Sequence, residues 1–171
     1  TEVEGLDQVA VRKAIAMAVD YDQVISSAMS GQSPTFADVP RSVMNPTDAE
    51  QAMVDQDALK EYQWSNADVE GAKKLLDDAG IVDTDGDGIR ELDGQNINLH
   101  YVSYENRLLN DFSNAHIQYL AEIGIGCTAD YGSSDDQWSK LAAGDYDFNN
   151  NNWITVGTGD PYAYMANWAT D

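Results

Sequence analysis

The chain has 171 residues, of which 30 are acidic and 9 basic, so its formal net charge is −21. A surface this acidic repels nucleic acids and anionic membranes, which excludes both as partners, and it attracts cations or cationic ligands. Apolar residues make up 43% of the chain, enough for a packed core, and the lone cysteine, Cys127, excludes an intrachain disulfide and a cysteine-based zinc site.

Two helices are predicted at the start of the chain. Apolar residues recur at helical spacing over residues 6–20. Asp20 and Gln23 then have the spacing of a capping box, which predicts a second helix that ends before Gly31. Residues 31–64 contain three prolines and no sustained period, so we expect a long irregular loop there.

A third helix and a first strand are predicted in the middle of the chain. The helix covers residues 65–80, with Ser65 or Asn66 as its N-cap and Gly80 at its end. Residues 96–103 alternate apolar and polar side chains, which is typical of a strand.

The next elements alternate between helix and strand. Residues 107–124 predict a helix and residues 123–131 a strand, with Cys127 on the apolar face of that strand as a buried core thiol. A short helix follows, in which Ser134 and Gln137 have the spacing of a second capping box.

The last third of the chain completes the pattern. Residues 146–155 predict another strand, and a final helix begins near Pro161. Helices that alternate with strands favour an α/β fold, in which helices pack on a mostly parallel or mixed sheet.

An acidic segment, residues 83–94, separates the third predicted helix from the first strand. Its spacing matches the first nine positions of an EF-hand-type calcium loop, but Gly94 stands where the bidentate Glu is expected. One interpretation is a structural calcium ion, and the other is a solvated turn rich in Asp and Gly. The calcium ligands would be Asp83, Asp85, Asp87, the carbonyl of Ile89, and Glu91.

Aromatic side chains crowd the last third of the chain. Flat apolar rings beside amide groups suit a cleft for a sugar or a peptide. Trp153 lies at the end of the predicted strand, where ligands bind in open α/β sheets, so we expect it in such a cleft. For Trp138 and Trp168, the alternative interpretation is that their side chains pack between a helix and the sheet.

No constellation for catalysis is apparent in the sequence, and no cofactor is required. His116 lies on the apolar face of its predicted helix, which favours a core histidine over a metal ligand, and His100 faces away from Leu99. A secreted hydrolase that uses a pair of carboxylates remains an alternative, although no local pattern selects two of the 30 acidic residues.

Four segments of the chain together resemble one family, the extracellular solute-binding proteins of family 5, which are peptide, nickel and oligosaccharide receptors of ABC importers. The resemblance covers nearly the whole chain in order. It implies an α/β lobe of the periplasmic-binding-protein type II, a mixed sheet flanked by helices. It also implies that residues 1–171 are one lobe of a two-lobed receptor, without the first lobe and the C-terminal return segment. The segments are residues 11–32, 72–102, 114–131 and 138–168.

The resemblance also assigns candidate ligand contacts. Trp153 matches a cleft tryptophan of the family's peptide receptors, and Trp138 matches the aromatic residue of the preceding helix. The aspartate that such receptors place three residues after the tryptophan is Val156 here, and Asp160 is not a clean substitute. The expected ligand-binding residues are Trp138, Asn150, Asn152, Trp153 and Asp160.

By resemblance, we expect a monomeric substrate-capture component with no catalysis. It would hold a peptide or similar small solute between two lobes and dock on an ABC permease, outside the cell or in the periplasm, with a lipid anchor on the full-length protein. Asn150 replaces a basic residue of some peptide receptors, so an oligosaccharide receptor is the alternative within the family. The alternatives outside the family are the carboxylate-pair hydrolase and a calcium-stiffened interaction module.

Overall fold

The computed structural model describes residues 5–28, 48–53, 55, 57–58, 66–105 and 109–149. The chain divides into two compact units. The first comprises Thr1–Ser33 and Trp64–Asn151, and the second Pro34–Gln63 and Asn152–Asp171. The described helix of the second unit, α3 at Asp48–Gln51, is one turn within the stretch that the sequence predicts to be irregular.

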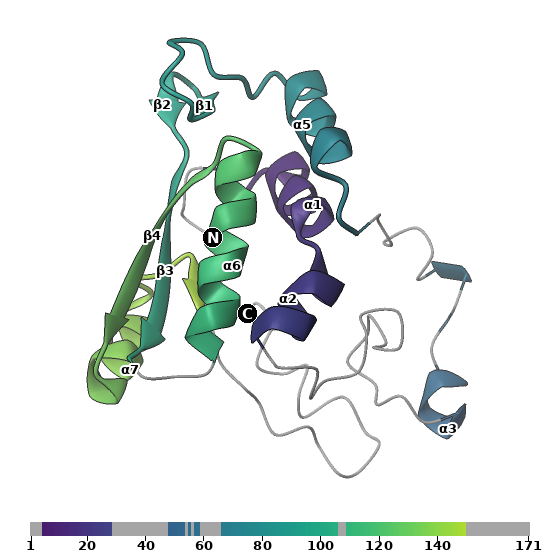
Figure 1. The fold of residues 1–171 in the computed structure, drawn as a ribbon, viewed down its shortest axis with the longest axis vertical. Helices are drawn as coiled ribbons and strands as arrows, with labels where there is room; N and C mark the ends of the chain where they lie inside the picture. Colours follow the sequence, from purple (N-terminus) through teal and green to yellow (C-terminus); the bar gives the residue numbers. More distant parts are fainter. Residues whose placement is uncertain are drawn as a thin grey trace. The chain divides into compact units, whose positions relative to one another are not determined.

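Five helices are described in the first unit, in the order that the sequence predicts (Figure 1). Each lies inside a segment that the sequence predicts to be helical. They are α1 at Val9–Ala18, α2 at Tyr21–Ala28, α5 at Val69–Asp78, α6 at Leu109–Glu122 and α7 at Ser134–Ala143.

The helix caps confirm one prediction and correct another. Asp20 Oδ1 accepts from the Gln23 amide at 2.9 Å, as the first capping pattern predicts. The N-cap of α5, however, is Asp68, whose Oδ1 accepts from the Gly71 amide at 2.9 Å. Asn66 instead accepts from the Tyr21 amide at the start of α2, 3.2 Å away. An ionised carboxylate at a helix N-terminus is favoured by the helix dipole, which explains why the cap lies after the predicted pair.

A parallel three-stranded sheet forms the centre of the first unit. The central strand is β3, Asn98–Tyr104, and it pairs in parallel with β4, Gly126–Gly132, and with β5, Phe148–Asn149. The order β4-β3-β5 confirms the predicted α/β arrangement.

A hairpin that the sequence interpretation missed begins at the end of the acidic segment and extends two residues beyond it. Strand β1, Glu91–Leu92, pairs antiparallel with β2, Gln95–Asn96. Asp93 and Gly94 form the turn with positive φ of 53° and 79°, the conformation that an Asp-Gly pair favours in tight hairpins. The Asp-Gly dipeptide was the available signal.

Helices lie on both faces of the parallel sheet. Side chains of a strand alternate between its faces. On β3, Tyr101 faces α6 and contacts His116 edge-on, with ring centroids 6.0 Å apart. On the opposite face α7 lies against the sheet, and its Lys140 binds Asp130 of β4. Figure 1 shows α6 between the strands and the pair α1 and α2, with α5 beyond α1.

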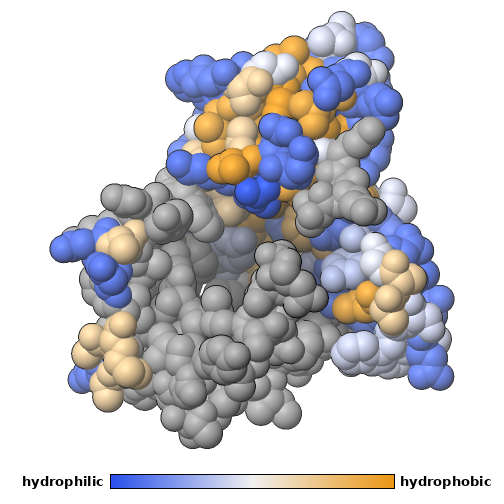
Figure 2. All heavy atoms as spheres, turned by 180° about the vertical axis from the view of Figure 1, so that it is seen from behind, coloured by the Kyte–Doolittle hydropathy of each residue, from blue (hydrophilic) through white to orange (hydrophobic). Residues whose placement is uncertain are grey.

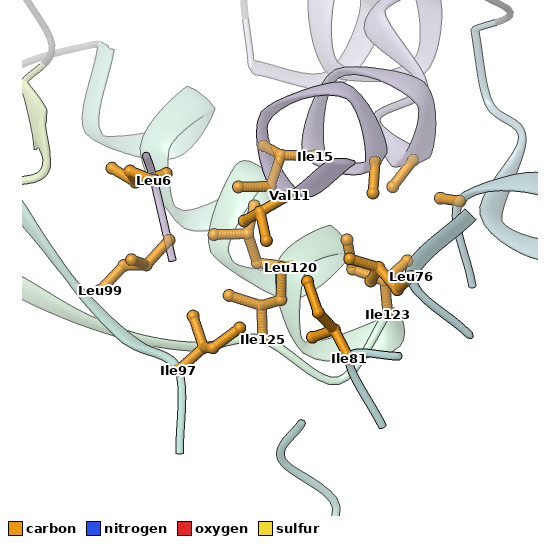
Figure 3. Close-up of a cluster of buried hydrophobic side chains, with 13 residues drawn as sticks. Leu6, Val11, Ile15, Leu76, Ile81, Ile97, Leu99, Leu120, Ile123 and Ile125 are labelled. Atoms are coloured by element: carbon orange, nitrogen blue, oxygen red, sulfur yellow. The ribbon is translucent and has the colours of Figure 1, made fainter. Parts of the chain in front are cut away.

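The main hydrophobic core lies between α6, α1, α5 and the sheet (Figure 3). Leu120 of α6 and Leu76 of α5 are fully buried, and Leu99 of β3 is almost fully buried. Burial of each such side chain stabilises the fold by about 1.5–3 kcal/mol. The other large members are Leu6, Val11, Ile15, Ile81, Ile97, Ile123 and Ile125.

Hydrophobic surface gathers at the end of the first unit that holds α5 and the β1–β2 hairpin, among hydrophilic residues (Figure 2). Within the described ranges, no helix is long and apolar enough to cross a membrane.

Candidate functional site

The three parallel strands bring their carboxyl ends to one edge of the sheet. β3 ends at Tyr104, β4 at Gly132 and β5 at Asn149. We call this the carboxyl edge. In open α/β sheets, ligands bind in the crevice outside the carboxyl ends of the strands. The carboxyl edge is therefore the candidate ligand site.

Polar side chains near this edge are held by hydrogen bonds between elements. Ser103 Oγ donates to Asn110 Oδ1 at 3.0 Å, and Asn110 Nδ2 donates to the Tyr104 carbonyl at 3.0 Å. These bonds join β3 to the start of α6. The Tyr131 hydroxyl donates to Asn114 Oδ1 at 2.9 Å, which joins β4 to the same helix.

Helix α7 begins directly after β4 and carries Trp138. Its N-cap is Ser133, whose hydroxyl accepts from the Asp136 amide at 3.1 Å, so the predicted cap at Ser134 is wrong by one residue. The side chain of Trp138 is 53% exposed. It does not fill the seam between helix and sheet, and a ring this open is accessible to a ligand.

Gln137, the residue before Trp138, makes a buried contact near the candidate site that sequence reasoning missed. The sequence pattern assigned it to a capping box, yet its side chain is only 2% exposed. Its Nε2 donates to Asn149 Oδ1 at 2.8 Å, across from α7 to β5. A buried amide needs such a partner, because an unpaired one costs free energy. No signal in the sequence links these two positions.

Four of the five predicted ligand contacts lie outside the described residues. Asn149 is the last described residue of the asparagine run. The roles of the others stay predictions. They are Asn150, Asn152, Trp153 and Asp160.

A charged network lies on the face of the sheet that α7 covers. Lys140 Nζ donates to Asp130 Oδ2 and to Asp136 Oδ2, both at 2.7 Å. His100 Nε2 lies 3.0 Å from Asp130 Oδ2. The hydrogen bond from Lys140, followed by that from His100, lowers the pKa of Asp130, while the two carboxylates raise the pKa of Lys140. The network holds α7 on β4.

The acidic segment brings together three carboxylates, those of Asp83, Asp85 and Glu91, whose oxygens lie within 4.8 Å of one another. Glu91 is buried, and its two oxygens accept from the Thr84 amide at 2.8 Å and the Thr84 hydroxyl at 2.7 Å. Three convergent carboxylates are hard oxygen donors that suit calcium, which takes six to eight oxygen ligands.

Of the other predicted calcium ligands, the carboxylate of Asp87 is not part of that group, and the carbonyl of Ile89 stays a prediction. Asp87 lies outside it, with Oδ1 accepting from the Ile89 amide at 2.8 Å and Oδ2 from Asn96 Nδ2 at 2.7 Å. Calcium binding therefore stays a prediction, and its best-supported ligands are the three convergent carboxylates.

A hollow of about 330 Å³ adjoins the acidic segment and does not belong to the carboxyl edge. Its two cationic side chains are paired: Arg90 Nη1 lies 2.6 Å from Asp77 Oδ1 in the lining, and Lys73 Nζ lies 3.0 Å from Oε1 of Glu70, which is outside the lining. Both cations are already in ion pairs, so neither is available to bind a ligand. The hollow is therefore a weaker candidate for the ligand site than the carboxyl edge.

The Cys127 thiol and the His116 imidazole are poorly suited to catalysis. Burial, followed by the nearby charge of Asp147, raises the pKa of the Cys127 thiol to about 11, which keeps it protonated and unreactive. The thiol is partly buried and packs against the core. His116 is 8% exposed among aromatic rings, as a core histidine is expected to be.

Solved structures similar to this chain are periplasmic binding proteins. The oligopeptide ABC transporter periplasmic oligopeptide-binding protein from Thermotoga maritima superposes with a TM-score of 0.82 at 21% identity, over 95% of this chain and 30% of that one. NikA from Brucella suis, in complex with Fe(III)-EDTA, gives 0.68 at 22%, over 96% and 31%. AppA from Bacillus subtilis, an oligopeptide-binding protein in complex with a nonapeptide, gives 0.67 at 21%, over 93% and 30%.

These similarities confirm the expected fold class, an α/β lobe of the type II periplasmic binding proteins. The chain spans about 30% of the length of these relatives. No curated protein matches the chain significantly by sequence.

The sequence model described as "Bacterial extracellular solute-binding proteins, family 5 Middle" matches residues 1–171, the whole chain. This family comprises solute-binding receptors and is not an enzyme family. The chain belongs to the bacterial extracellular solute-binding proteins of family 5.

Proposed function

We propose that this chain is part of the substrate-capture component of an ABC importer, which binds a peptide or similar small solute between two lobes. The carboxyl edge of the β4-β3-β5 sheet would form one wall of the binding cleft. The second wall would belong to the other lobe of the full-length receptor.

The observation that carries this proposal is the exposed indole of Trp138, which follows the buried Gln137 in α7. A large aromatic residue that is half exposed, in a helix that begins directly after a strand end, suits a ligand contact, since rings stack on flat or apolar parts of a solute. Family membership over all 171 residues supports the same conclusion.

An oligosaccharide is the second candidate ligand. The Thermotoga maritima relative also has a structure with mannohexaose bound, with a TM-score of 0.79 to this chain. Here Val156 stands in place of the aspartate that peptide receptors use for the α-amino group, and Asn150 replaces a basic residue. Indole rings and carboxamides would bind a neutral sugar as well as a peptide.

The remaining parts of the proposal follow from the family. The full-length protein would be an extracellular or periplasmic monomer, held by a lipid anchor, that delivers its solute to a membrane permease. It would have no catalytic activity, so a panel of peptides and glycosides should show no turnover. Hydrolysis of any member of that panel would favour the carboxylate-pair hydrolase instead.

Tryptophan fluorescence of the full-length receptor tests the binding proposal. We expect a saturable change with either a pool of random pentapeptides or mannohexaose. Trp153→Ala should abolish the change, because this indole is the predicted centre of the cleft. Trp138→Ala should weaken binding of the responding probe by roughly 10-fold, the loss expected for one stacked aromatic side chain.

Tyr146→Ala serves as the matched control, since Tyr146 is also an exposed aromatic residue but precedes β5, away from the carboxyl edge. It should bind as the unaltered receptor does. Normal binding by both tryptophan variants would show that the cleft is assigned to the wrong residues.

A further inference from the structure

We infer that Gln137 is a positioning residue of the binding site, whose buried amide fixes Trp138 of α7 relative to Asn149 of β5. This inference rests on the proposed function, because it concerns the arrangement of the predicted ligand contacts. The hydrogen bond from Gln137 Nε2 to Asn149 Oδ1, 2.8 Å long, is the structural basis. We call this pair the α7–β5 clip.

Each end of the clip is one peptide away from a predicted ligand contact. Gln137 precedes Trp138 in α7, and Asn149 precedes Asn150 in the chain. Successive helical residues are about 100° apart around the helix axis. Gln137 is therefore held inward, at 2% exposure, while Trp138 points outward at 53%. The clip thus holds α7, together with the Lys140–Asp130 contact, in the rotation that exposes the indole.

The other contacts of β5 within the described residues are on its α6 face or within the sheet, so Gln137 supplies the side-chain contact on its α7 face. Phe148 stacks on Tyr101 with ring centroids 5.5 Å apart and contacts His116 edge-on, so it fastens the α6 face of β5. Ladder pairing in the described strand involves two residues, Tyr101↔Phe148 and Val102↔Asn149. On the α7 face, the side chain of Asn149 is fastened by the hydrogen bond to Gln137.

The first and last turns of α7 are held on β4 by other contacts, so the clip adds a separate attachment to β5. Ser133 follows β4 without an intervening residue and caps the helix. Lys140, one turn after Asp136, binds Asp130 of β4. These contacts attach α7 to β4, whereas the clip attaches it to β5, the strand that leads into the predicted contacts.

Binding measurements on the full-length receptor provide the first arm of the test, with the pentapeptide pool and mannohexaose as probes. Gln137→Met keeps the length of the side chain and removes the amide, and Asn149→Ala removes its partner. Each should weaken binding of the responding probe by roughly 5- to 50-fold, because α7 and β5 are no longer held together by the clip and Trp138 loses its fixed position. Measurements are made well below the melting temperature of every variant.

A reciprocal swap separates positioning from simple stability. Gln137→Asn shortens one partner by one methylene, and Asn149→Gln lengthens the other by the same amount. Each single change should weaken binding, and the double variant should recover it to within about threefold, since the hydrogen bond is restored. Ser139→Ala is the matched control, because it removes a hydrogen bond from Ser139 Oγ to the Asp135 carbonyl within α7 itself. It should bind normally.

A second arm needs no solute. In receptor labelled with 5-fluorotryptophan, the ¹⁹F resonance of Trp138 should shift or broaden in Asn149→Ala, twelve positions away in the chain, and stay unchanged in Ser139→Ala. An unchanged Trp138 resonance in Asn149→Ala overturns the inference, as does a folded Gln137→Met variant that binds like the unaltered receptor. If the unaltered receptor binds neither probe, the proposed function fails, and the resonance alone decides whether the clip fixes Trp138.

Discussion

The imidazole of His116 has no hydrogen-bond partner within the described residues. Tyr101, Phe112 and Phe148 surround it, with ring centroids 5.3–6.5 Å away. Burial lowers its pKa from 6.5 to about 4, because the charged form would lose its hydration among these rings. This histidine contributes to packing as a neutral ring and makes the fold sensitive to acid.

The direction of the pH effect follows from the two pKa values. The unfolded chain binds a proton near pH 6.5, whereas the folded state binds one only near pH 4. Between these values the unfolded state holds more protons, so stability falls as the pH falls. The stability that depends on a neutral His116 is fully present above pH 6.5. About 3 kcal/mol of the free energy of unfolding is lost once the pH is below about 4.

His116→Phe should therefore remove part of the acid sensitivity. We expect this variant to gain about 2–3 kcal/mol in the free energy of unfolding, relative to the original protein, between about pH 7 and about pH 4.5. Denaturant titrations at the two pH values measure this difference. His100→Asn is the control at the other histidine, which is partly exposed and paired with Asp130. Equal pH dependence in His116→Phe and the original protein would contradict the argument.

At the level of single residues, the sequence predicts which side chains are buried better than it predicts their hydrogen-bond partners. The position of His116 on an apolar helix face predicts its burial, and the structure confirms it. The bond between Gln137 and Asn149 joins residues 12 apart in sequence from different elements. Such contacts depend on how α7 packs against the sheet, which no local pattern encodes.

Among the connections between elements, Arg90 joins three segments at the amino side of the sheet. Its Nε donates to the Ile123 carbonyl at 2.8 Å, after the end of α6. Its Nη1 donates to the Ile81 carbonyl at 2.6 Å and to Asp77 Oδ1 at 2.6 Å. One guanidinium thus satisfies two carbonyls that follow helix ends, where helical partners are lacking.

Arg90→Met should destabilise the protein by about 3 kcal/mol, because two partly buried carbonyls lose a charged donor. Denaturant titration near pH 7 measures the change. Lys74→Met is the matched control: this exposed lysine pairs with Asp78 within α5 and should cost no more than about 0.5 kcal/mol. Similar losses for the two variants would mean that the contacts of Arg90 add little to stability.

A second prediction at this scale concerns calcium binding by the acidic segment. If Asp83, Asp85 and Glu91 bind calcium, calcium should raise the melting temperature and chelator should lower it, because a ligand of the native state stabilises that state. Asp83→Asn should abolish the response. Asp93→Asn, in the hairpin turn outside the group, should retain it. A calcium-independent melting temperature would leave the segment as a solvated turn.

Element boundaries show why local patterns are incomplete. The sequence predicts α5 correctly, but the N-cap depends on which oxygen points at the free amides, and Asp68 has that position. Asn66 has the right chemistry for a cap but accepts from Tyr21, a residue 45 positions away. The β1–β2 hairpin was missed because each of its strands has two residues, too few for an alternation to appear.

For the whole molecule, the net charge of −21 is the dominant electrostatic feature. Like charges repel more strongly in the compact state, so a large net charge lowers stability. Salt weakens this repulsion, because the screening length falls from about 30 Å at 0.01 M to about 3 Å at 1 M.

The melting temperature should accordingly rise by on the order of 5 °C between low and high sodium chloride, by screening of this repulsion. Tetramethylammonium chloride at the same ionic strength should give a similar rise, because screening does not depend on the identity of the cation. Calorimetric scans compare the two salts. A melting temperature that is flat or falls with salt would show that repulsion does not limit stability.

The alternation of helices and strands predicts the layered architecture, and the parallel order β4-β3-β5 agrees with it. The fold was predictable because it depends on periodicity and element order, which are spread over many residues. The site is less predictable, since it depends on a few side chains and on chain segments distant in sequence.

The acidic hairpin and the carboxyl edge lie at opposite ends of β3, a strand of seven residues that measures roughly 20 Å. Substitutions in the hairpin are therefore too far away to touch a solute held beyond Tyr104. The two proposed roles, ion binding at the hairpin and ligand choice at the carboxyl edge, should therefore respond independently to substitution.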